Sequence, residues 1–278
     1  MYKRQTLLIA SKHEKEKVIT PILEKVLGVK CIVAKNFDTD ELGTFTGEIE
    51  RTDDPITTVR KKCQLAMEVS NCDMAIASEG SFGPHPSVFF VSADDEFLIF
   101  IDKKNGLEII ARELSTETNF NGLEIGSEKE LLDFANDSKF PSHGLILRKS
   151  KDSKEDIFKG IATTKKLIEA FNNLIDKHGK AYVETDMRAM YNPTRMKVIE
   201  KATEKLVEKI GSECPKCKMP GYSVTDSKSG LLCENCGTPT RSTLAHILSC
   251  RSCSFTEEKL YPFGKKLEGP TFCDFCNP

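Results

Sequence analysis

The 278-residue sequence lacks the features that define several protein classes. It has no apolar run approaching the ~20 residues that a membrane-spanning helix needs. Its net charge is −2, so no global field draws the protein toward nucleic acid or a membrane surface. The apolar stretch at 6–10 is too short for a signal-peptide core, and no small-residue cleavage site follows it. We therefore expect a cytoplasmic protein.

Cysteine is sparse in most of the chain and dense near its end. Of the 11 cysteines, Cys31, Cys63 and Cys72 are scattered through the first 200 residues, and the other eight lie within 214–276. A secreted disulfide scaffold would instead spread cysteines over a small chain. Paired spacing in a chain expected to be cytoplasmic indicates metal binding.

The eight C-terminal cysteines form four C-x-x-C pairs, separated by 15, 13 and 19 residues. Two intervening residues let a tight turn bring both thiolates of a pair to one metal, and two such turns complete a tetrahedral site. We predict two structural Zn²⁺ ions in a double zinc-ribbon module, in preference to an iron–sulfur cluster or a redox dithiol. The predicted ligands are Cys214, Cys217, Cys233, Cys236, Cys250, Cys253, Cys273 and Cys276.

The spacing alone leaves the pairing of these cysteines open. We favour sequential pairing, in which the first two C-x-x-C pairs share one zinc and the last two share the other; alternate pairs are the second possibility. The segment has few large aliphatic residues, so zinc must supply much of its folding free energy. Nucleic-acid contact is a weaker functional alternative, because eight Lys/Arg face six Asp/Glu between 214 and 278. Its candidate stacking residues are Tyr222, Phe255, Tyr261 and Phe263.

The first 211 residues read as strand–helix–strand–helix–strand, followed by a three-stranded meander. This order predicts an α/β domain with a mixed sheet flanked by helices. We expect turns at Asp94-Asp95 and Asn105-Gly106 to divide the meander. Capping boxes are expected at Ser11 and Ser127, and an N-cap at Asp54. A long helix is expected from 154 to 177.

Three places in this domain carry candidate chemistry. The first is the turn after the strand at 7–10, where Ser11, Lys12 and Lys15 crowd the start of a helix. Cations there oppose the helix dipole, and a bound phosphate would reverse that penalty. The alternative is a solvated face, because Glu14 and Glu16 interleave with the cations.

The second place is Glu79, just beyond the strand at 74–77, because ligands of open α/β sheets lie past the carboxyl ends of strands. A divalent metal is the expected ligand, and a turn with an exposed acid is the alternative.

The third place is the stretch containing Glu184, Asp186 and Arg188, which share one face if it is extended. We interpret it as a metal or phosphate site, with a structural salt-bridge ladder as the alternative. Arg195, one turn into the following helix, could join Arg188 in binding phosphate.

Three motifs resemble the inosine/xanthosine triphosphatase fold in its shorter bacterial branch. They are Ala10-Ser11-Lys12-His13, Thr58-Val59-Arg60-Lys61-Lys62-Cys63 and Ala77-Ser78-Glu79-Gly80-Ser81. They stand where that family has a small residue, Ser/Thr and Asn, then a basic helix, then an acid and a glycine. The resemblance spans 8 to about 175 and implies cleavage of non-standard purine nucleoside triphosphates with Mg²⁺ or Mn²⁺. His13 replaces the family's asparagine, and its lysine is displaced to Lys15 or Lys17.

A second resemblance covers most of the chain. The runs 184–189 and 191–196, and the four cysteine pairs ending in Cys276-Asn277-Pro278, are similar to a family of uncharacterised bacterial proteins named only as a domain of unknown function. This resemblance implies no activity.

We therefore expect a mixed α/β domain at 1–211, similar to nucleoside triphosphatases, and a double zinc-ribbon module at 212–278. The first function hypothesis is a Mg²⁺- or Mn²⁺-dependent hydrolase of a phosphorylated, nucleotide-like substrate. Its catalytic residues would be Glu79, Glu184 and Asp186. Its phosphate-binding residues would be Ser11, Lys12, Lys15, Arg60, Arg188 and Arg195. The second hypothesis is a non-catalytic zinc protein that binds nucleic acid or a protein partner.

Overall fold

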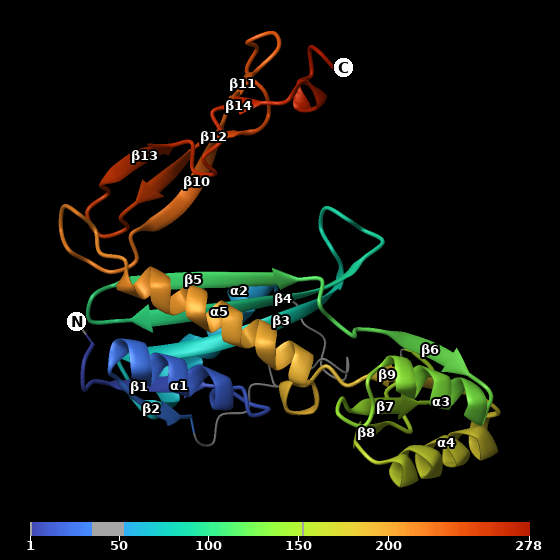
Figure 1. Cartoon of the computed structure of the whole chain (residues 1–278). Helices are drawn as coiled ribbons and strands as arrows, with labels where there is room; N and C mark the ends of the chain where they lie inside the picture. The colour runs from blue at the N-terminus through green and yellow to red at the C-terminus, as the bar shows by residue number, and fades with distance from the viewer. Residues whose placement is uncertain (1, 35–52, 152) are drawn as a thin grey trace. The chain divides into compact units, whose positions relative to one another are not determined.

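The computed structural model describes residues 2–34, 53–151 and 153–278 (Figure 1). They form two compact units, Met1–Val207 and Glu208–Pro278. Sheets flanked by helices in the first unit and a cysteine-rich second unit confirm the predicted fold class. No helix within the described ranges combines the length and apolar character required to cross a membrane.

A five-stranded mixed sheet is the centre of the first unit. Its order is β2-β1-β3-β4-β5; β2, β1 and β3 are parallel, and β4 and β5 continue as an antiparallel meander. The strands are β1 (Thr6–Ala10), β2 (Lys30–Val33), β3 (Met74–Pro84), β4 (Ser92–Asp102) and β5 (Leu107–Ser115).

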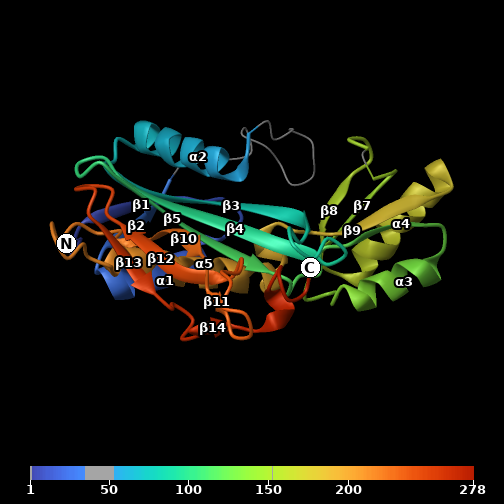
Figure 2. The same ribbon diagram turned by 90° about the horizontal axis from the view of Figure 1, so that it is seen from above.

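Helices cover both faces of this sheet. Helix α2 (Pro55–Ser70) lies on one face, and α1 (Glu16–Leu27) and α5 (Pro193–Gly211) lie on the other, as Figures 1 and 2 both show. Alternate residues of a strand point to opposite faces, so Ala75 and Ala77 join the α2 core while Ile76 points the other way. Helix α2 begins at the predicted Asp54 cap, whose side chain accepts from the backbone N–H groups of Ile56 and Thr57.

A second, four-stranded antiparallel sheet belongs to the same unit, so the α/β region holds two sheets. Its order is β6-β9-β7-β8. One face packs in a single apolar core against α3 and α4. The other face carries Arg148 and Glu184. The elements are β6 (Gly122–Ile125), α3 (Glu128–Asp137), β7 (Leu145–Arg148), β8 (Phe158–Ile161), α4 (Thr164–His178) and β9 (Ala181–Thr185), followed by the 3-10 turn η2 (Ala189–Tyr191).

Several predicted boundaries are wrong. The strand predicted at 74–77 extends to Pro84 and so contains Glu79, and β4 and β5 follow it in place of the predicted three-stranded meander. Asp94-Asp95 lies inside β4 rather than in a turn. Contacts across the sheet hold this stretch extended, since Asp95 accepts a hydrogen bond from Arg112 on β5 at 2.6 Å. The predicted helix at 154–177 begins only at Thr164, after the Thr163 cap. Residues 158–161 pair with β7 instead, and Gly160 takes a left-handed φ of 66° there.

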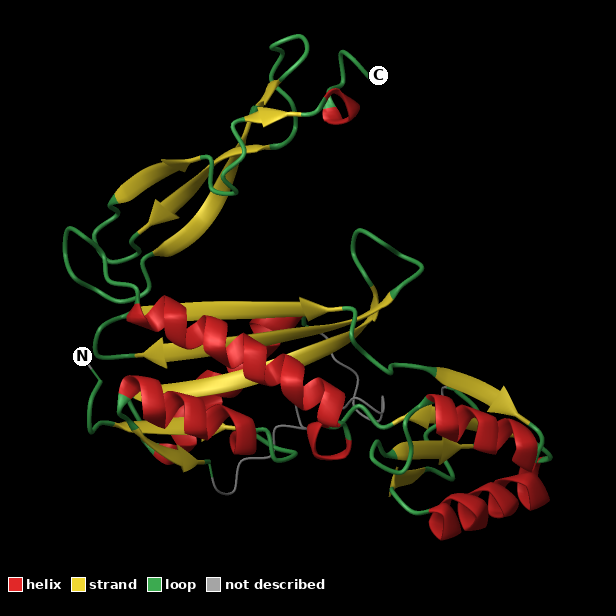
Figure 3. Cartoon of the chain, viewed as in Figure 1, coloured by secondary structure: helices red, strands yellow, loops and turns green. Residues whose placement is uncertain are grey.

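The second unit is built from short strands joined by long turns, as the colouring in Figure 3 makes plain. A three-stranded antiparallel sheet has the order β10-β12-β13, and β11 pairs with β14 in parallel. The elements are β10 (Ser223–Ser229), β11 (Leu232–Cys233), β12 (Thr243–Ser249), β13 (Thr256–Leu260), β14 (Leu267–Glu268) and the 3-10 turn η3 (Pro270–Phe272).

Candidate functional site

The eight predicted cysteine ligands form two four-sulfur groups. One contains Cys214, Cys217, Cys250 and Cys253; the other contains Cys233, Cys236, Cys273 and Cys276; within each, the sulfur atoms lie within 4.8 Å of one another. Sulfur–sulfur distances across the pairs are 3.6–3.9 Å. A zinc ion with tetrahedral Zn–S bonds would hold its sulfurs about 3.8 Å apart. Both groups therefore fit a metal of this size and geometry.

Alternate pairs share a group, so the favoured sequential pairing is wrong. The β-sheet register decides this, because Ser223 on β10 pairs with Ser249 on β12, which brings the first C-x-x-C turn beside the third. In the same way, Cys233 on β11 pairs with Glu268 on β14, which brings the second turn toward the fourth. Spacing cannot reveal long-range strand pairing of this kind.

Each C-x-x-C turn has the same backbone form. The N–H of the residue after the second cysteine donates to the carbonyl of the first cysteine, at 2.8–2.9 Å in all four turns. Lys218, Gly237 and Ser254 take left-handed φ values at this position. The turn aims both thiols of a pair the same way, as a shared metal requires.

Two of the aromatic residues considered for base stacking are committed to packing. Tyr222 is buried beside Cys214 and Cys250, with Phe255 against the same cluster. The Tyr222 hydroxyl also donates to Glu257 at 2.9 Å. Phe263, by contrast, is 73% exposed.

The pairing can be tested by counting metal in two double variants. Cys217→Ser/Cys250→Ser damages one group, whereas Cys217→Ser/Cys236→Ser damages both. We expect the first variant to retain more zinc than the second when purified protein is analysed by mass spectrometry of the metal. Sequential pairing predicts the opposite order, so the reverse result would contradict the interleaved arrangement.

In the first unit, a buried cluster of charged side chains lies beyond the carboxyl end of β1. It begins at the loop 11–15, where His13 and Glu14 both take left-handed φ values. The predicted capping box at Ser11 is wrong, since α1 starts at Glu16 and the Ser11 hydroxyl contacts the Glu16 carboxylate at 3.2 Å. This loop turns the Lys15 side chain inward, and its ammonium donates to the Ser78 hydroxyl at 3.1 Å.

Lys15 is surrounded by the other charges of the cluster. Burial is the main cause that lowers the pKa of Lys15 to about 8, and the positive charge of Arg195 adds to it. Glu96 and Glu79 oppose this shift, and Lys62 favours it. These five side chains come from the loop 11–15, α2, β3, β4 and α5, so the fold gathers them from distant parts of the chain.

Glu79 lies on β3 and faces α2. It is 2% exposed and forms an ion pair with Lys62, which is also buried. Lys62 belongs to the basic motif of α2 that suggested Arg60 as a phosphate ligand. Arg60 points elsewhere, because residues two apart lie on different sides of a helix. It makes a two-pronged contact with Glu108, at 2.9 and 2.7 Å.

Arg195 and Glu96 meet on the opposite face of the sheet, and both are fully buried. The Nε of Arg195 donates to Glu96 Oε1 at 2.6 Å, and its Nη1 donates to the carbonyl of Met187. The guanidinium also lies over the Phe82 ring, 5.0 Å from its centre. Gly80 pairs with Glu96 across the strands, and a Cβ at Gly80 would overlap both Glu96 and Arg195. Glycine is therefore needed there for close approach.

Asp94 differs from the other charged residues of the cluster in its hydrogen bonding. It is 1% exposed, and neither of its carboxylate oxygens has a hydrogen-bond partner among the described residues. Burial, reinforced by the nearby charge of Glu96, raises the pKa of Asp94 to about 8. The Oε2 atom of Glu96 likewise lacks a partner in the described part of the chain. Burying carboxylate oxygens without partners costs free energy, and a proton, a cation or another ligand bound to these oxygens would offset that cost.

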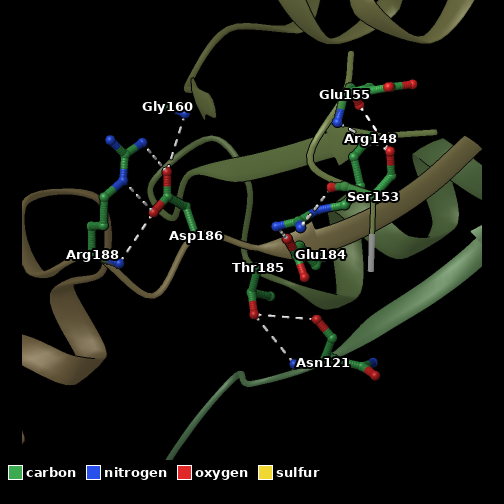
Figure 4. A network of polar contacts seen from close by, with 9 residues as sticks. All are labelled: Asn121, Arg148, Ser153, Glu155, Gly160, Glu184, Thr185, Asp186 and Arg188. Carbon is green, nitrogen blue, oxygen red and sulfur yellow. Dashed lines mark hydrogen bonds and ion pairs between the residues drawn. The ribbon is translucent and has the colours of Figure 1, made fainter. Parts of the chain in front are cut away.

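The other predicted acids belong to a separate network at the four-stranded sheet (Figure 4). Glu184 on β9 forms an ion pair with Arg148 on β7, and burial raises the pKa of Glu184 against the opposing charge of Arg148. Asp186 is fully buried, and its two oxygens accept from Arg188 and from the backbone N–H of Gly160, at 2.6–3.1 Å. Both oxygens of Asp186 are therefore satisfied by the protein itself.

The two networks touch through one segment. Arg195 donates to the carbonyl of Met187, which stands between Asp186 and Arg188. A small cavity of about 50 Å³ is lined by Phe82 and Met187 together with Glu184 and Asp186. Within the described residues, only the two cysteine groups gather three or more ligand side chains closely enough to hold a metal, so Glu79, Glu184 and Asp186 do not form one acidic triad.

The sequence reasoning missed Lys62, Asp94 and Glu96. Lys62 belongs to the basic motif, and helical periodicity would have placed it on the same buried face as Val59 and Cys63. Asp94 and Glu96 were hidden by the interpretation of Asp94-Asp95 as a turn. Three consecutive acids, Asp94 to Glu96, show no alternation of polar and apolar residues, so no local strand signal could have found them.

Comparisons with known proteins place the chain in a family without assigning it an activity. No curated protein matches the sequence. Among solved structures, the crystal structure of protein VC0702 from Vibrio cholerae has a TM-score of 0.32 and 9% identity, over 74% of this chain and 94% of that one. That TM-score is too low to establish a shared fold. A family described as a domain of unknown function, DUF6671, matches residues 62–278. The chain belongs to this family.

Proposed function

We propose that this protein is a metal-dependent hydrolase of a phosphorylated, nucleotide-like substrate, with two structural zinc ions in its C-terminal unit. The supporting observation is that Lys15, Glu79 and Arg195, each a candidate from sequence alone, belong to one buried cluster beyond the carboxyl end of β1. That edge of an open α/β sheet is where ligands bind in related architectures. Both the location and the charges of the cluster therefore suit a ligand-binding site.

The cations of the cluster suit a phosphoryl group. Lys15 and Lys62 are ammonium groups on opposite sides of β3, and the guanidinium of Arg195 lies one strand away. Cations held in place in a buried setting stabilise developing negative charge more strongly than they would in water. A bound Mg²⁺ or Mn²⁺ would add Lewis-acid polarisation and an activated water. Glu79 is the acid of this cluster that we assign a catalytic role.

Asp186 and Glu184 are weaker catalytic candidates. Their carboxylates pair with arginine side chains of the separate network at the four-stranded sheet, outside the cluster that contains Lys15, Glu79 and Arg195. Arg188 is engaged in the same way. Ser11 and Lys12 lie on the half-buried loop that leads to Lys15.

Turnover on a panel of nucleotides tests the proposal. The zinc-loaded protein would be incubated with standard and non-standard purine nucleoside triphosphates and Mg²⁺ or Mn²⁺, with release of phosphate and pyrophosphate as the readout. We expect Lys15→Met to lower the rate by about 100-fold or more, the usual loss when a preorganised charge-stabilising group is removed. Lys17→Met is the matched control, since Lys17 is exposed and pairs only locally with Glu14.

Two results would count against the hydrolase. One is the absence of turnover on any substrate of the panel. The other is turnover that survives Lys15→Met and Glu79→Gln in variants whose melting temperatures match the wild type.

The non-catalytic alternative has one specific observation in its favour. Phe263, Phe272 and Phe275 are 65–74% exposed, and the Lys265 ammonium lies 5.9 Å from the Phe272 ring. Exposed aromatic rings beside cations suit stacking on single-stranded nucleic acid. Salt-sensitive binding to oligonucleotides without turnover would favour this function over the hydrolase.

A further inference from the structure

We propose that Asp94 and Glu96 form a divalent-cation site on β4, for an ion of the Mg²⁺ and Mn²⁺ class. This inference deepens the proposed hydrolase, because it assigns the metal to two residues that carried no role in the sequence-based hypothesis. It stands on three carboxylate oxygens that are buried and lack hydrogen-bond partners in the described structure: Asp94 Oδ1, Asp94 Oδ2 and Glu96 Oε2.

The β4 backbone places both carboxylates on one face. Asp94 and Glu96 are two residues apart in the strand, opposite Phe82 and Gly80 of β3. The lack of a side chain at Gly80 leaves the space that Glu96 and Arg195 fill. Arg195 takes Glu96 Oε1 and so holds that carboxylate in a fixed orientation, with Oε2 remaining as the ligand atom. Such support from a second residue is typical of metal-ligating carboxylates.

The chemistry of the donor set selects the class of ion. Carboxylate oxygens bind hard divalent cations, and Mg²⁺ commonly takes one or two carboxylates with water and substrate phosphate completing its shell. Zinc and other thiophilic metals have better ligands in the two cysteine groups of the second unit. Two carboxylates are therefore enough for the proposed ion, provided that a phosphate joins them.

The neighbouring cations make phosphate part of the site. Lys15 and Arg195 lie beside Asp94, and their positive charge opposes a metal ion that binds alone. The same charges attract a phosphate that bridges to the ion. We therefore expect the cation to bind weakly by itself and more tightly together with inorganic phosphate.

A structural role explains the pair less well. Arg195 and Glu96 can stabilise the packing of α5 on the sheet without Asp94. An aspartate with two buried oxygens and no hydrogen-bond donor only destabilises a purely structural cluster. A hydrophobic or amide side chain would serve better there, and the cation site supplies the missing partner.

Mn²⁺ binding to the zinc-loaded full chain tests the inference without reference to turnover. Bound Mn²⁺ would be measured by electron paramagnetic resonance, alone and with inorganic phosphate. We expect Asp94→Asn and Glu96→Gln each to weaken binding by at least about tenfold, since even the outer partners of metal ligands are worth that much. Asp95→Asn is the matched control, because Asp95 faces the other side of β4 and pairs with Arg112.

A thermal shift gives a second readout for each variant. Mn²⁺ with phosphate should raise the melting temperature of the wild type and of Asp95→Asn, and should leave that of folded Asp94→Asn unchanged. Binding that is unaffected in Asp94→Asn, or that is lost only in Glu79→Gln, would overturn the inference. Mn²⁺ binding with the expected variant pattern but no hydrolysis would uphold the cation site and reject the hydrolase. Hydrolysis at an unchanged rate in Asp94→Asn would uphold the hydrolase and reject the cation site.

Discussion

Removing metal from the protein is expected to unfold residues 208–278 while residues 2–34 and 53–207 keep their structure. The buried apolar cluster of the second unit is small and consists mainly of Cys214, Cys250 and Tyr222. The first unit has its own cores, such as the one that packs α3 and α4 on the four-stranded sheet. Structural zinc contributes about 10–16 kcal/mol in small zinc-binding peptides, more than so few apolar contacts can replace.

The interleaved arrangement strengthens this expectation. The segment between Cys217 and Cys250, closed by the first metal, contains Cys233 and Cys236 of the second group. Loss of the first ion would therefore free the loop that carries half of the second group, so it should weaken binding of the second ion without abolishing it.

Hydrogen exchange before and after treatment with a strong chelator is the direct measurement. Amides of β10, β12 and β13 should lose protection, and those of β3 and β4 should keep it. Metal analysis should find two zinc ions per chain in the untreated protein. A tail that keeps its protection after chelation, or a content well below two zinc ions with no iron in their place, would refute the prediction.

Replacing Arg195 by methionine is expected to destabilise the first unit by about 3–5 kcal/mol, the cost of breaking a buried ion pair on one side. The substitution leaves Glu96 buried without its cation and also removes the donor to the Met187 carbonyl. The free energy of unfolding of the zinc-loaded protein would be followed by the exchange of β3 and β4 amides in urea.

Two further variants show whether charge burial is the cause. Arg112→Met breaks the Arg112–Asp95 pair, which is partly exposed, and should cost less than about 1 kcal/mol. Arg195→Met/Glu96→Gln removes both charges and should recover part of the loss, because a neutral pair carries a smaller desolvation penalty. A loss in Arg195→Met no larger than that in Arg112→Met would show that the pair contributes little.

Local patterns in the sequence predicted what depends on neighbouring residues. The Asp54 cap followed by Pro55 begins α2, and the Ser127–Glu130 capping box begins α3. The four C-x-x-C turns predicted the metal ligands because each turn is complete within a few residues. Lys15 was found as a candidate for the same reason, since it follows the end of a recognisable strand; Glu79 was found from a predicted strand end at Ala77, although β3 continues to Pro84.

Long-range pairing decided the rest. Strand register joined alternate cysteine pairs, against the sequential order that spacing had favoured. The β3–β4 pairing set Asp94 and Glu96 beside Gly80, and α5 then brought Arg195 to them from about 100 positions further along the chain. The sequence by itself determined the fold class and the chemistry of the C-terminal unit, because these follow from local periodicity and ligand spacing. Only the tertiary structure decided which thiols belong to one four-sulfur group and which buried charges form ion pairs, such as Arg195 with Glu96. Those contacts depend on the energy of packing distant segments together.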